Sequence, residues 1–364
     1  MAYLNVDEIE SALVNLAQAY PNESKLIELP HKTIEGRKTH AISIGSRSAS
    51  AIKTVLIVGG IHAREWVPPD ALVYLAADLL EAFGSSTGLR YEGKYFSKTD
   101  IKNVFDNLKI VLYPCANPDG RNYSQNTESM WRKNRNPNTG APCKGVDINR
   151  NFDVLWDFPT YFAPGSVSAS QDTCKDIFIG SSAASEPETK NVAWLIQQPN
   201  VGWFIDVHSA IPAIFHSWGI DENQSTDPTM NFQNAAYNGV RGRTGDSNYK
   251  EYIPVSDLDE CKRLSKAMAE AIKAVNNNDY SVSQAFDLYS TSGASDDFAY
   301  SLGFKNGGQD RIFGFTIECG TEFQPPWNQA QMVMREVCAG LIEFMVSTLT
   351  PSSFQPLVHE SHAE

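Results

Sequence analysis

The sequence predicts an α/β fold with a mixed, mostly parallel central β-sheet, helices on both faces and a single globular domain. Apolar runs rich in β-branched residues recur along the chain, and stretches with helical periodicity lie between them. Strands that alternate with helices are typical of layered α/β sheets. The 364 residues, of which 42% are hydrophobic, are sufficient for one large core.

An amphipathic helix is expected over residues 6 to 20, because apolar side chains recur there at helical spacing and Pro21 follows. Apolar runs predict strands at Thr54 to Val58, Leu108 to Tyr113, Trp203 to Val207 and Ile312 to Ile317. Runs this apolar are typical of strands that are covered on both faces. Helical patterns lie between and after them at Asp70 to Phe83, Pro187 to Gln198, Leu258 to Val275 and Gln329 to Thr348.

The composition excludes several function classes. With 30 Lys and Arg against 43 Asp and Glu, the net charge is −13, and no basic run offsets it, so nucleic acid is not an expected partner. No apolar run approaches the roughly 18 residues of a membrane span, so no membrane is expected either. The six cysteines include no C-x-x-C pair, which argues against a zinc knuckle or a redox motif.

Two predicted strands end at side chains that can bind a metal. His62 and Glu65 follow the strand at 54 to 58, and His208 follows the strand at 203 to 207. Ligands of open α/β sheets bind at the carboxyl ends of the strands, so these side chains are expected to meet. Two imidazoles and one carboxylate are a ligand set of catalytic Zn²⁺. The alternative is that both are loop histidines, hydrogen-bonded to the backbone.

Several further motifs follow in order along the chain. They are His62-Ala63-Arg64-Glu65, Asn117-Pro118-Asp119-Gly120, Trp131-Arg132-Lys133-Asn134-Arg135, Gly145-Val146-Asp147-Ile148-Asn149-Arg150-Asn151-Phe152, His208-Ser209, Leu288-Tyr289 and Phe315-Thr316-Ile317-Glu318. This order resembles the zinc metallocarboxypeptidases of the carboxypeptidase A/B type over nearly the whole chain. The resemblance implies a zinc-dependent exopeptidase that hydrolyses the C-terminal peptide bond of peptides and proteins, with one Zn²⁺ per chain.

The resemblance also assigns the reacting groups. It implies that His62, Glu65 and His208 hold Zn²⁺, which activates a water molecule and polarises the scissile carbonyl. Glu318 matches the general base, which accepts the proton of the water and passes it to the leaving amine. Arg132 matches the arginine that stabilises the oxyanion. Without the resemblance, the alternative for Glu318 is a solvated glutamate at a strand end.

The resemblance also implies which residues bind the C-terminal end of the substrate. Asn149 and Arg150 match the pair that clamps the free C-terminal carboxylate, for which a guanidinium offers two parallel hydrogen bonds. Tyr289 matches the mobile tyrosine that covers the bound residue, and Arg64 a secondary arginine on the substrate path. The alternative for residues 131 to 135 and 149 to 152 is a basic, solvated loop.

Asp296 falls where B-type enzymes carry an aspartate and A-type enzymes an apolar residue, which predicts a preference for C-terminal Lys or Arg. The alternative is that Ser295 and Asp296 simply begin a helix, where Ser and Asp are favoured. The enzyme would then be an A-type or broad-specificity carboxypeptidase that releases apolar or aromatic residues. A cell-wall peptidase, a deacylase and a non-catalytic peptide-binding module are less favoured, because the metal, base and clamp residues are all present.

The domain, disulfide and location follow from the same resemblance. Residues 1 to 350 would form the catalytic domain and residues 351 to 364 a flexible tail, and we expect a monomer. Cys143 and Cys174 align with a disulfide of secreted relatives, which would indicate an extracellular protein, although the first residues of this chain lack the pattern of a signal peptide. Ala210 replaces a tyrosine that many relatives carry beside the penultimate substrate residue.

Overall fold

An eight-stranded sheet runs through the protein in the order β1-β2-β6-β3-β7-β12-β8-β11. The structure, a computed structural model, describes residues 3–45, 53–305 and 311–350. The strands of this sheet are β1 (Ser24–Glu28), β2 (His40–Gly45), β3 (Lys53–Gly59), β6 (Leu108–Tyr113), β7 (Val201–His208), β8 (Ala213–His216), β11 (Ser281–Gln284) and β12 (Phe313–Glu318). The four central strands, β6, β3, β7 and β12, are parallel, whereas the β1–β2, β2–β6 and β12–β8 pairs are antiparallel. The predicted mixed, mostly parallel sheet is confirmed.

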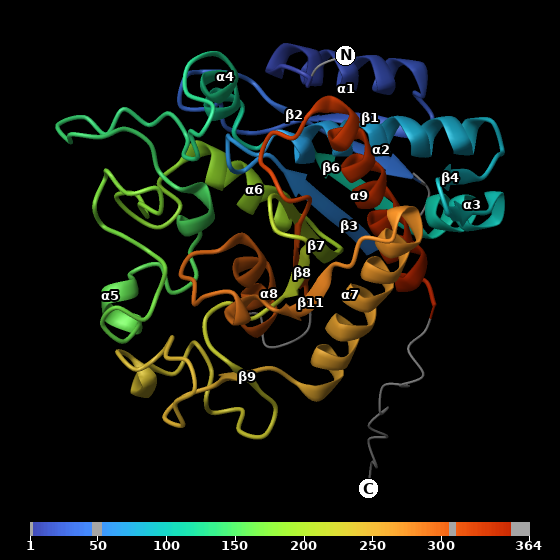
Figure 1. Ribbon diagram of the computed structural model, residues 1–364. Coiled ribbons are helices and arrows are strands. Elements are labelled where there is room, and N and C mark those ends of the chain that lie inside the picture. Colours follow the sequence, from blue (N-terminus) through green and yellow to red (C-terminus); the bar gives the residue numbers. More distant parts are fainter. Residues whose placement is uncertain (1–2, 46–52, 306–310, 351–364) are drawn as a thin grey trace, which may run out of the picture.

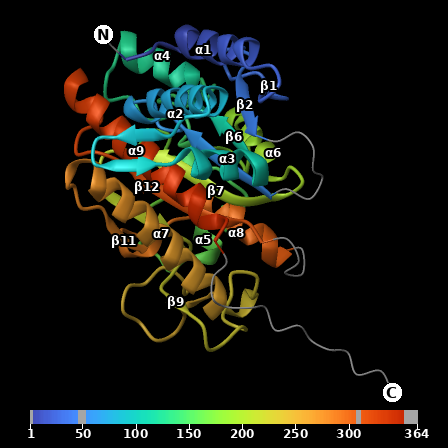
Figure 2. The ribbon, with the colours of Figure 1, turned by 90° about the vertical axis from the view of Figure 1, so that its right-hand side faces the viewer.

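Helices cover both faces of this sheet, as predicted (Figures 1 and 2). They are α1 (Val6–Ala19), α2 (Val67–Gly84), α3 (Lys98–Asn107), α4 (Pro118–Asn126), α5 (Phe158–Tyr161), α6 (Pro187–Ile196), α7 (Val255–Asn276), α8 (Ser295–Lys305) and α9 (Trp327–Thr348). Two short pairs, β4 (Leu89–Tyr91) with β5 (Lys94–Phe96) and β9 (Asn223–Gln224) with β10 (Glu251–Tyr252), lie outside the main sheet.

The apolar runs are explained by two cores, one on each face of the sheet. In β3, Val55 and Ile57 face the core that contains α2, α7 and α9, while Leu56 and Val58 face the core that contains α6 and α8. Successive side chains of a strand point to opposite faces, so a strand covered on both sides is apolar at every position. The central strands are therefore buried over most of their length, and polar side chains collect at their carboxyl ends.

The main differences from the sequence-based expectations lie at the edges and in the long loops. The edge strands β1 and β11 have few apolar residues, and β11 is largely exposed, so neither forms an apolar run. In the polar stretch from 117 to 180, for which no helix was predicted, α4 begins at Pro118, with Asn117 as its cap. The predicted tail at 351–364 lies outside the described residues.

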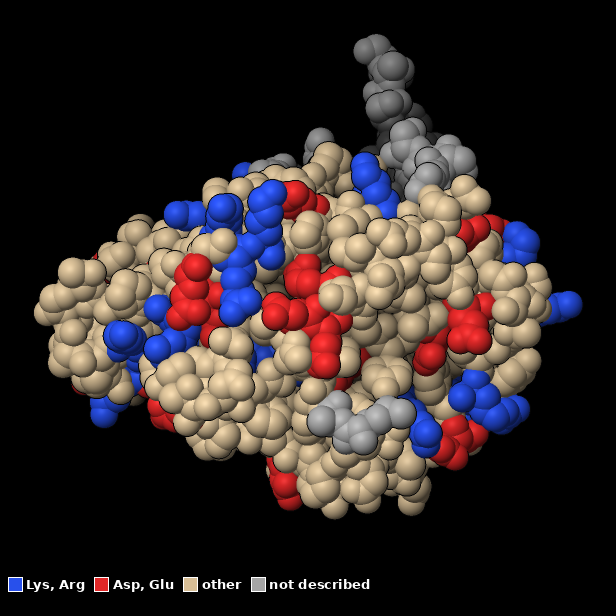
Figure 3. Space-filling view, turned by 90° about the horizontal axis from the view of Figure 1, so that it is seen from above, with Lys and Arg blue, Asp and Glu red and all other residues tan. Residues whose placement is uncertain are grey.

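Two properties of the surface bear on partners. None of the helices in the described ranges is long and apolar enough to cross a membrane. Seen from above, the side of α1 and α4, Lys and Arg side chains lie interspersed with Asp and Glu (Figure 3). This face therefore does not present the continuous positive surface that a phosphate backbone requires.

Candidate metal and active site

The carboxyl ends of three neighbouring strands bring the predicted metal ligands and the predicted base together. His62 and Glu65 lie in the turn that connects β3 to α2, and His208 is the last residue of β7. Glu318 is the last residue of β12, and the parallel register sets it opposite His208. Side chains that lie up to 256 residues apart in sequence therefore meet at one edge of the sheet.

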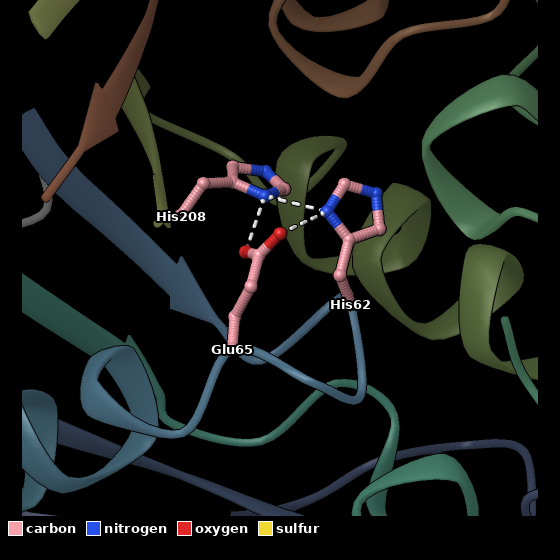
Figure 4. A group of neighbouring side chains, drawn as sticks. All are labelled: His62, Glu65 and His208. Atoms are coloured by element: carbon pink, nitrogen blue, oxygen red, sulfur yellow. Dashed lines mark hydrogen bonds and ion pairs between the residues drawn. The ribbon is translucent and has the colours of Figure 1, made fainter. Parts of the chain in front are cut away.

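The three predicted metal ligands form a tight, buried group (Figure 4). His62 Nδ1 lies 2.8 Å from Glu65 Oε1 and 3.0 Å from His208 Nδ1, and His208 Nδ1 lies 3.0 Å from Glu65 Oε2. Within the described part of the chain, no other group of three or more His, Cys, Asp or Glu places its donor atoms within 4.8 Å of one another. Two imidazole nitrogens and a carboxylate that converge in this way fit Zn²⁺.

Two aspartates that the sequence analysis did not assign lie behind the histidines. Asp147 Oδ1 is 3.3 Å from His62 Nε2, and Asp206 Oδ2 is 2.9 Å from His208 Nε2. Burial lowers the pKa of His208, but Asp206 and Glu65 outweigh it and hold the pKa well above its usual value. Burial raises the pKa of Glu65, yet the two histidines hold it below its usual value. An aspartate inside an otherwise apolar strand, two residues before a histidine, is the signal that could have identified Asp206.

The side chain of Asn117 connects the two segments that carry His62 and Arg132. Its Nδ2 donates to the carbonyls of Ile61 and Lys133, at 3.0 and 3.1 Å, so it joins the turn that carries His62 to the segment that carries Arg132. Its Oδ1 accepts from the backbone N–H of Gly120 and caps α4. A Cβ on Gly120 would lie 2.6 Å from the Asn117 side chain, so only glycine fits there.

The predicted oxyanion arginine is held by Asp147. Arg132 Nε and Nη2 donate to Asp147 Oδ2 at 3.1 and 2.9 Å. Burial lowers the pKa of Arg132, but Asp147 and Glu65 outweigh it and keep the guanidinium charged. Burial likewise raises the pKa of Asp147, while Arg132 and His62 hold it well below its usual value. A fixed cation therefore lies beside the metal ligands.

One pocket connects the candidate reaction centre to the candidate substrate site. The predicted residues that line it are His62, Arg132, Asn149, Arg150, His208, Tyr289, Asp296 and Glu318. Burial, followed by the charge of Glu65, raises the pKa of Glu318 to about 8, against the opposing charges of His208 and Arg132. A carboxylate with a raised pKa is a better proton acceptor than an ordinary glutamate.

The predicted carboxylate clamp is a buried arginine with fixed neighbours. Arg150 Nε donates to the carbonyl of Ser168 at 2.6 Å, and Nη1 donates to the carbonyl of Asn149, also at 2.6 Å. The Arg150 Cζ lies 5.7 Å from the centroid of the Tyr289 ring, and Tyr289 is 44% exposed. The arginine is therefore anchored, while the tyrosine remains accessible at the mouth of the pocket.

Asp296 both begins a helix and lines the pocket, so the two interpretations of this residue are compatible. It is the second residue of α8 and is almost fully buried. Its Oδ1 accepts from the backbone of Asp297 at 2.9 Å, and its Oδ2 accepts from Thr316 Oγ1 at 3.0 Å. Burial raises its pKa. A Cβ on Gly219 would lie 2.4 Å from the hydroxyl of Thr291, which lines the same pocket, so a small residue is required at this rim.

Arg64 is the one predicted site residue outside the pocket lining and the metal-ligand group. Its Nη1 donates to Asp176 at 3.2 Å, and its Cζ lies 4.5 Å from the centroid of the Phe323 ring. The predicted disulfide between Cys143 and Cys174 is present and closes a loop with a sequence separation of 31. Cys319, next to the candidate base, is a buried free cysteine.

Comparisons with known proteins point to one family. A family model described as zinc carboxypeptidase matches residues 9–340. Carboxypeptidase O from Bos taurus is 27% identical over 320 residues, which are 87% of this chain and 70% of that protein. Carboxypeptidase B from Astacus astacus is 28% identical over 307 residues, 83% of each chain.

Solved structures share the fold. The crystal structure of thrombin activatable fibrinolysis inhibitor has a TM-score of 0.73 and 22% identity, and the match covers 95% of this chain and 74% of that one. Carboxypeptidase A from Helicoverpa armigera has a TM-score of 0.71 and 23% identity over the same shares. Since the family model spans nearly the whole chain, this protein belongs to the zinc carboxypeptidases, peptidases that cleave at the carboxyl end of a peptide chain.

Proposed function

We propose that this zinc carboxypeptidase removes C-terminal Lys or Arg and holds one Zn²⁺ through His62, Glu65 and His208. The observation that carries the preference is the buried carboxylate of Asp296, which lines the same pocket as Arg150 and Glu318. The C-terminal residue of the substrate could therefore bind Asp296 with its side chain and Arg150 with its carboxylate.

The donor set supports zinc as the metal. Both histidines turn Nδ1 towards the carboxylate of Glu65 and turn Nε2 towards an aspartate. This second carboxylate contact is a usual feature of histidines that bind metals, because it fixes the tautomer and the ring orientation. When bound, Zn²⁺ supplies Lewis-acid polarisation of the scissile carbonyl and lowers the pKa of water.

Glu318 and Arg132 have the roles that complete the reaction. Glu318 accepts the proton of the attacking water and returns it to the amine that leaves. Arg132 donates hydrogen bonds to the oxygen of the scissile carbonyl as negative charge develops on it. Because the Arg132 guanidinium is already held by Asp147, it needs little reorganisation during the reaction.

Binding of the substrate terminus makes the enzyme an exopeptidase. Arg150 and Asn149 bind the free carboxylate, and Tyr289 covers the terminal residue from the open side of the pocket. Arg64 lies on the substrate path further from the terminus. A peptide that continues beyond this residue would have no carboxylate for Arg150 to bind.

The walls of the pocket are suited to a long basic side chain. Phe215, Ala285, Leu288 and Ala294 line it together with Asp296. The methylene groups of Lys and Arg pack on apolar surface while the charged end reaches a carboxylate. At about 4 Å and an effective dielectric near 20, opposite unit charges gain about 4 kcal/mol before desolvation. Even a fraction of this gain would distinguish Lys from Phe.

The rest of the proposal concerns the setting of the enzyme. The metal ligands, base and clamp all belong to one chain, which supports a monomer that acts on peptide or protein C-termini. The Cys143–Cys174 disulfide supports an oxidising, extracellular compartment. Residues 1–350 would be the catalytic domain.

The test is a comparison of matched peptides that end in Lys, Arg, Phe, Leu or Glu, with and without a zinc chelator. We expect chelator-sensitive release of Lys and Arg, restored by added Zn²⁺, with Phe at least about tenfold slower. Asp296→Asn should reduce the ratio of Lys to Phe release by about tenfold or more, whereas Asp287→Asn, which removes an exposed carboxylate next in sequence to the pocket-lining Leu288, should leave the ratio unchanged.

Other results would change the proposal. Zinc-dependent release that favours Phe or Leu would point to an A-type or broad-specificity enzyme, and Asp296 would then only begin the helix. No release from any peptide at saturating zinc would contradict the proposed exopeptidase activity and favour the peptide-binding module.

A further inference from the structure

Asp206 is a charged residue inside an otherwise apolar, fully covered strand. Its neighbours Ile205 and Val207 pack in the core that contains α2, α7 and α9. Asp206 and His208 therefore share the other face of β7, because side chains two residues apart in a strand point the same way. The Asp206 side chain is inaccessible to solvent, and Oδ2 lies 2.9 Å from His208 Nε2.

The contact with Asp206 determines which ring nitrogen of His208 points towards the metal-ligand group. Since Nε2 lies 2.9 Å from Asp206 Oδ2, Nδ1 of His208 is the ring nitrogen that faces Glu65 Oε2 and His62 Nδ1, each at 3.0 Å. A histidine that binds a metal through one ring nitrogen must carry its proton on the other, and a carboxylate at that position fixes this tautomer.

A role in folding stability alone does not account for Asp206. Its Oδ1 is buried and has no hydrogen-bond partner among the described residues. Taking a carboxylate out of water is unfavourable unless its oxygens are fully hydrogen-bonded, and an apolar residue would pack in the sheet without this cost. The packing of β7 therefore does not explain why an acidic residue occupies position 206.

The second contact of Asp206 leads to the substrate pocket. Ser295 Oγ donates to Asp206 Oδ2 at 2.6 Å, and Ser295 is the first residue of α8. Thr316, which pairs with Asp206 across β7 and β12, donates to Asp296, the next residue of α8. One carboxylate thus contacts both a metal ligand and the start of the helix that presents Asp296 to the pocket.

We propose that Asp206 is a positioning residue that orients His208 for Zn²⁺ and fixes the start of α8, so that it affects both zinc affinity and binding of the terminal substrate residue. The inference rests on the proposed function, since it assumes that His208 binds zinc and that Asp296 contacts substrate. Asp206 itself belongs neither to the metal-ligand group nor to the residues that line the pocket, and acts on both through its neighbours.

The first test measures zinc affinity without substrate, by competition with a chromophoric chelator. Asp206→Ala should raise the Kd for Zn²⁺ by about 10- to 100-fold, the usual effect of losing a carboxylate behind a metal-binding histidine. Asp206→Asn keeps the shape and one acceptor oxygen, so its Kd should lie between that of Asp206→Ala and that of the wild type. Asp78→Asn is the matched control: Asp78 accepts from Tyr91 on the far side of α2 and should leave the Kd within about twofold.

The second test separates the two contacts of Asp206. Ser295→Ala removes only the contact with α8, so it should raise the KM for a Lys-ending peptide severalfold and change the Kd for Zn²⁺ by less than about threefold. An unchanged KM would contradict the link to the pocket.

A zinc Kd within about twofold of the wild type for folded Asp206→Asn would overturn the inference, and this isosteric variant decides the matter if Asp206→Ala does not fold. Circular dichroism and thermal melting establish the folded fraction. Because the titration contains no peptide, a wild-type protein that binds zinc but releases no terminal residue would contradict the proposed activity without affecting the conclusion about Asp206.

Discussion

Arg132 donates two hydrogen bonds to a single oxygen of Asp147, and the other oxygen of this carboxylate contacts the metal-ligand candidate His62. Asp147 therefore holds both the cation that would stabilise the oxyanion and the imidazole that would bind zinc. Substitutions of Asp147 and of Arg132 should have different effects, because only Asp147 contacts the metal-ligand candidate His62 directly.

Asp147→Asn should weaken zinc binding by about 10- to 100-fold and also lower kcat, because an amide cannot accept from both Arg132 and His62 without presenting an N–H to one of them. Arg132→Ala should lower kcat by about 10²-fold while the Kd for zinc remains near the wild-type value. Equal loss of zinc affinity in both variants would contradict this division. Chelator competition and steady-state kinetics on the same preparations measure both quantities.

Glu318→Gln should lower kcat by about 10²- to 10⁴-fold, because the amide cannot accept the proton of the attacking water. The side chain keeps its size, so the Kd for zinc and the affinity for a non-hydrolysed Lys-ending peptide analogue should change little. Isothermal titration measures the analogue and chelator competition the metal. Residual activity above a tenth of the wild-type value would remove Glu318 from the role of base.

How much of this site could be predicted differs from residue to residue. His62, Glu65 and His208 follow buried apolar strands, and apolar runs are visible without any structure. The contact between His62 and Asp147 joins residues 85 positions apart, and no local pattern indicates which loop carboxylate will reach the imidazole. Asp206 is an intermediate case, since strand alternation places it on the same face as His208.

The fold shows the same division. The central strands and the long helices were predictable because each is apolar over many residues or repeats at helical spacing. The edge strand β11 is half exposed and pairs only with β8, so its position is decided by a neighbour distant in sequence. The α4 helix depends on the Asn117 cap, a single side-chain contact within a polar stretch.

The buried Glu251 predicts how stability depends on pH. Burial raises its pKa to about 8, and its oxygens accept from the Phe232 backbone and the Tyr249 hydroxyl. Between about pH 4.5 and 8 the unfolded chain has lost this proton while the folded protein keeps it, so stability falls as pH rises. Glu251→Gln should remove this part of the decline, on the order of 1 to 4 kcal/mol across that range.

Urea denaturation at several pH values between 5 and 8 measures this effect. The variant and the wild type should differ least at pH 5 and most at pH 8, with the variant more stable at the alkaline end. Parallel curves for the two proteins would contradict a raised pKa for Glu251.

Removal of the Cys143–Cys174 disulfide should destabilise the folded protein. For a sequence separation of 31, the loss of the chain constraint corresponds to about 3 to 4 kcal/mol in the chain-entropy account. The double variant Cys143→Ser, Cys174→Ser should lose this amount in denaturant unfolding. A loss below about 1 kcal/mol would indicate that the loop is held by its other contacts.

The register of β12 against β7, which sets Glu318 opposite His208, limits how this protein can change. Because side chains alternate along a strand, inserting or deleting one residue in either strand would turn the base or the metal ligand to the opposite face of the sheet. The loops around the pocket carry no such restriction and can change length. Substrate preference can therefore change when these loops change. The catalytic chemistry, in contrast, requires that β7 and β12 neither gain nor lose a single residue.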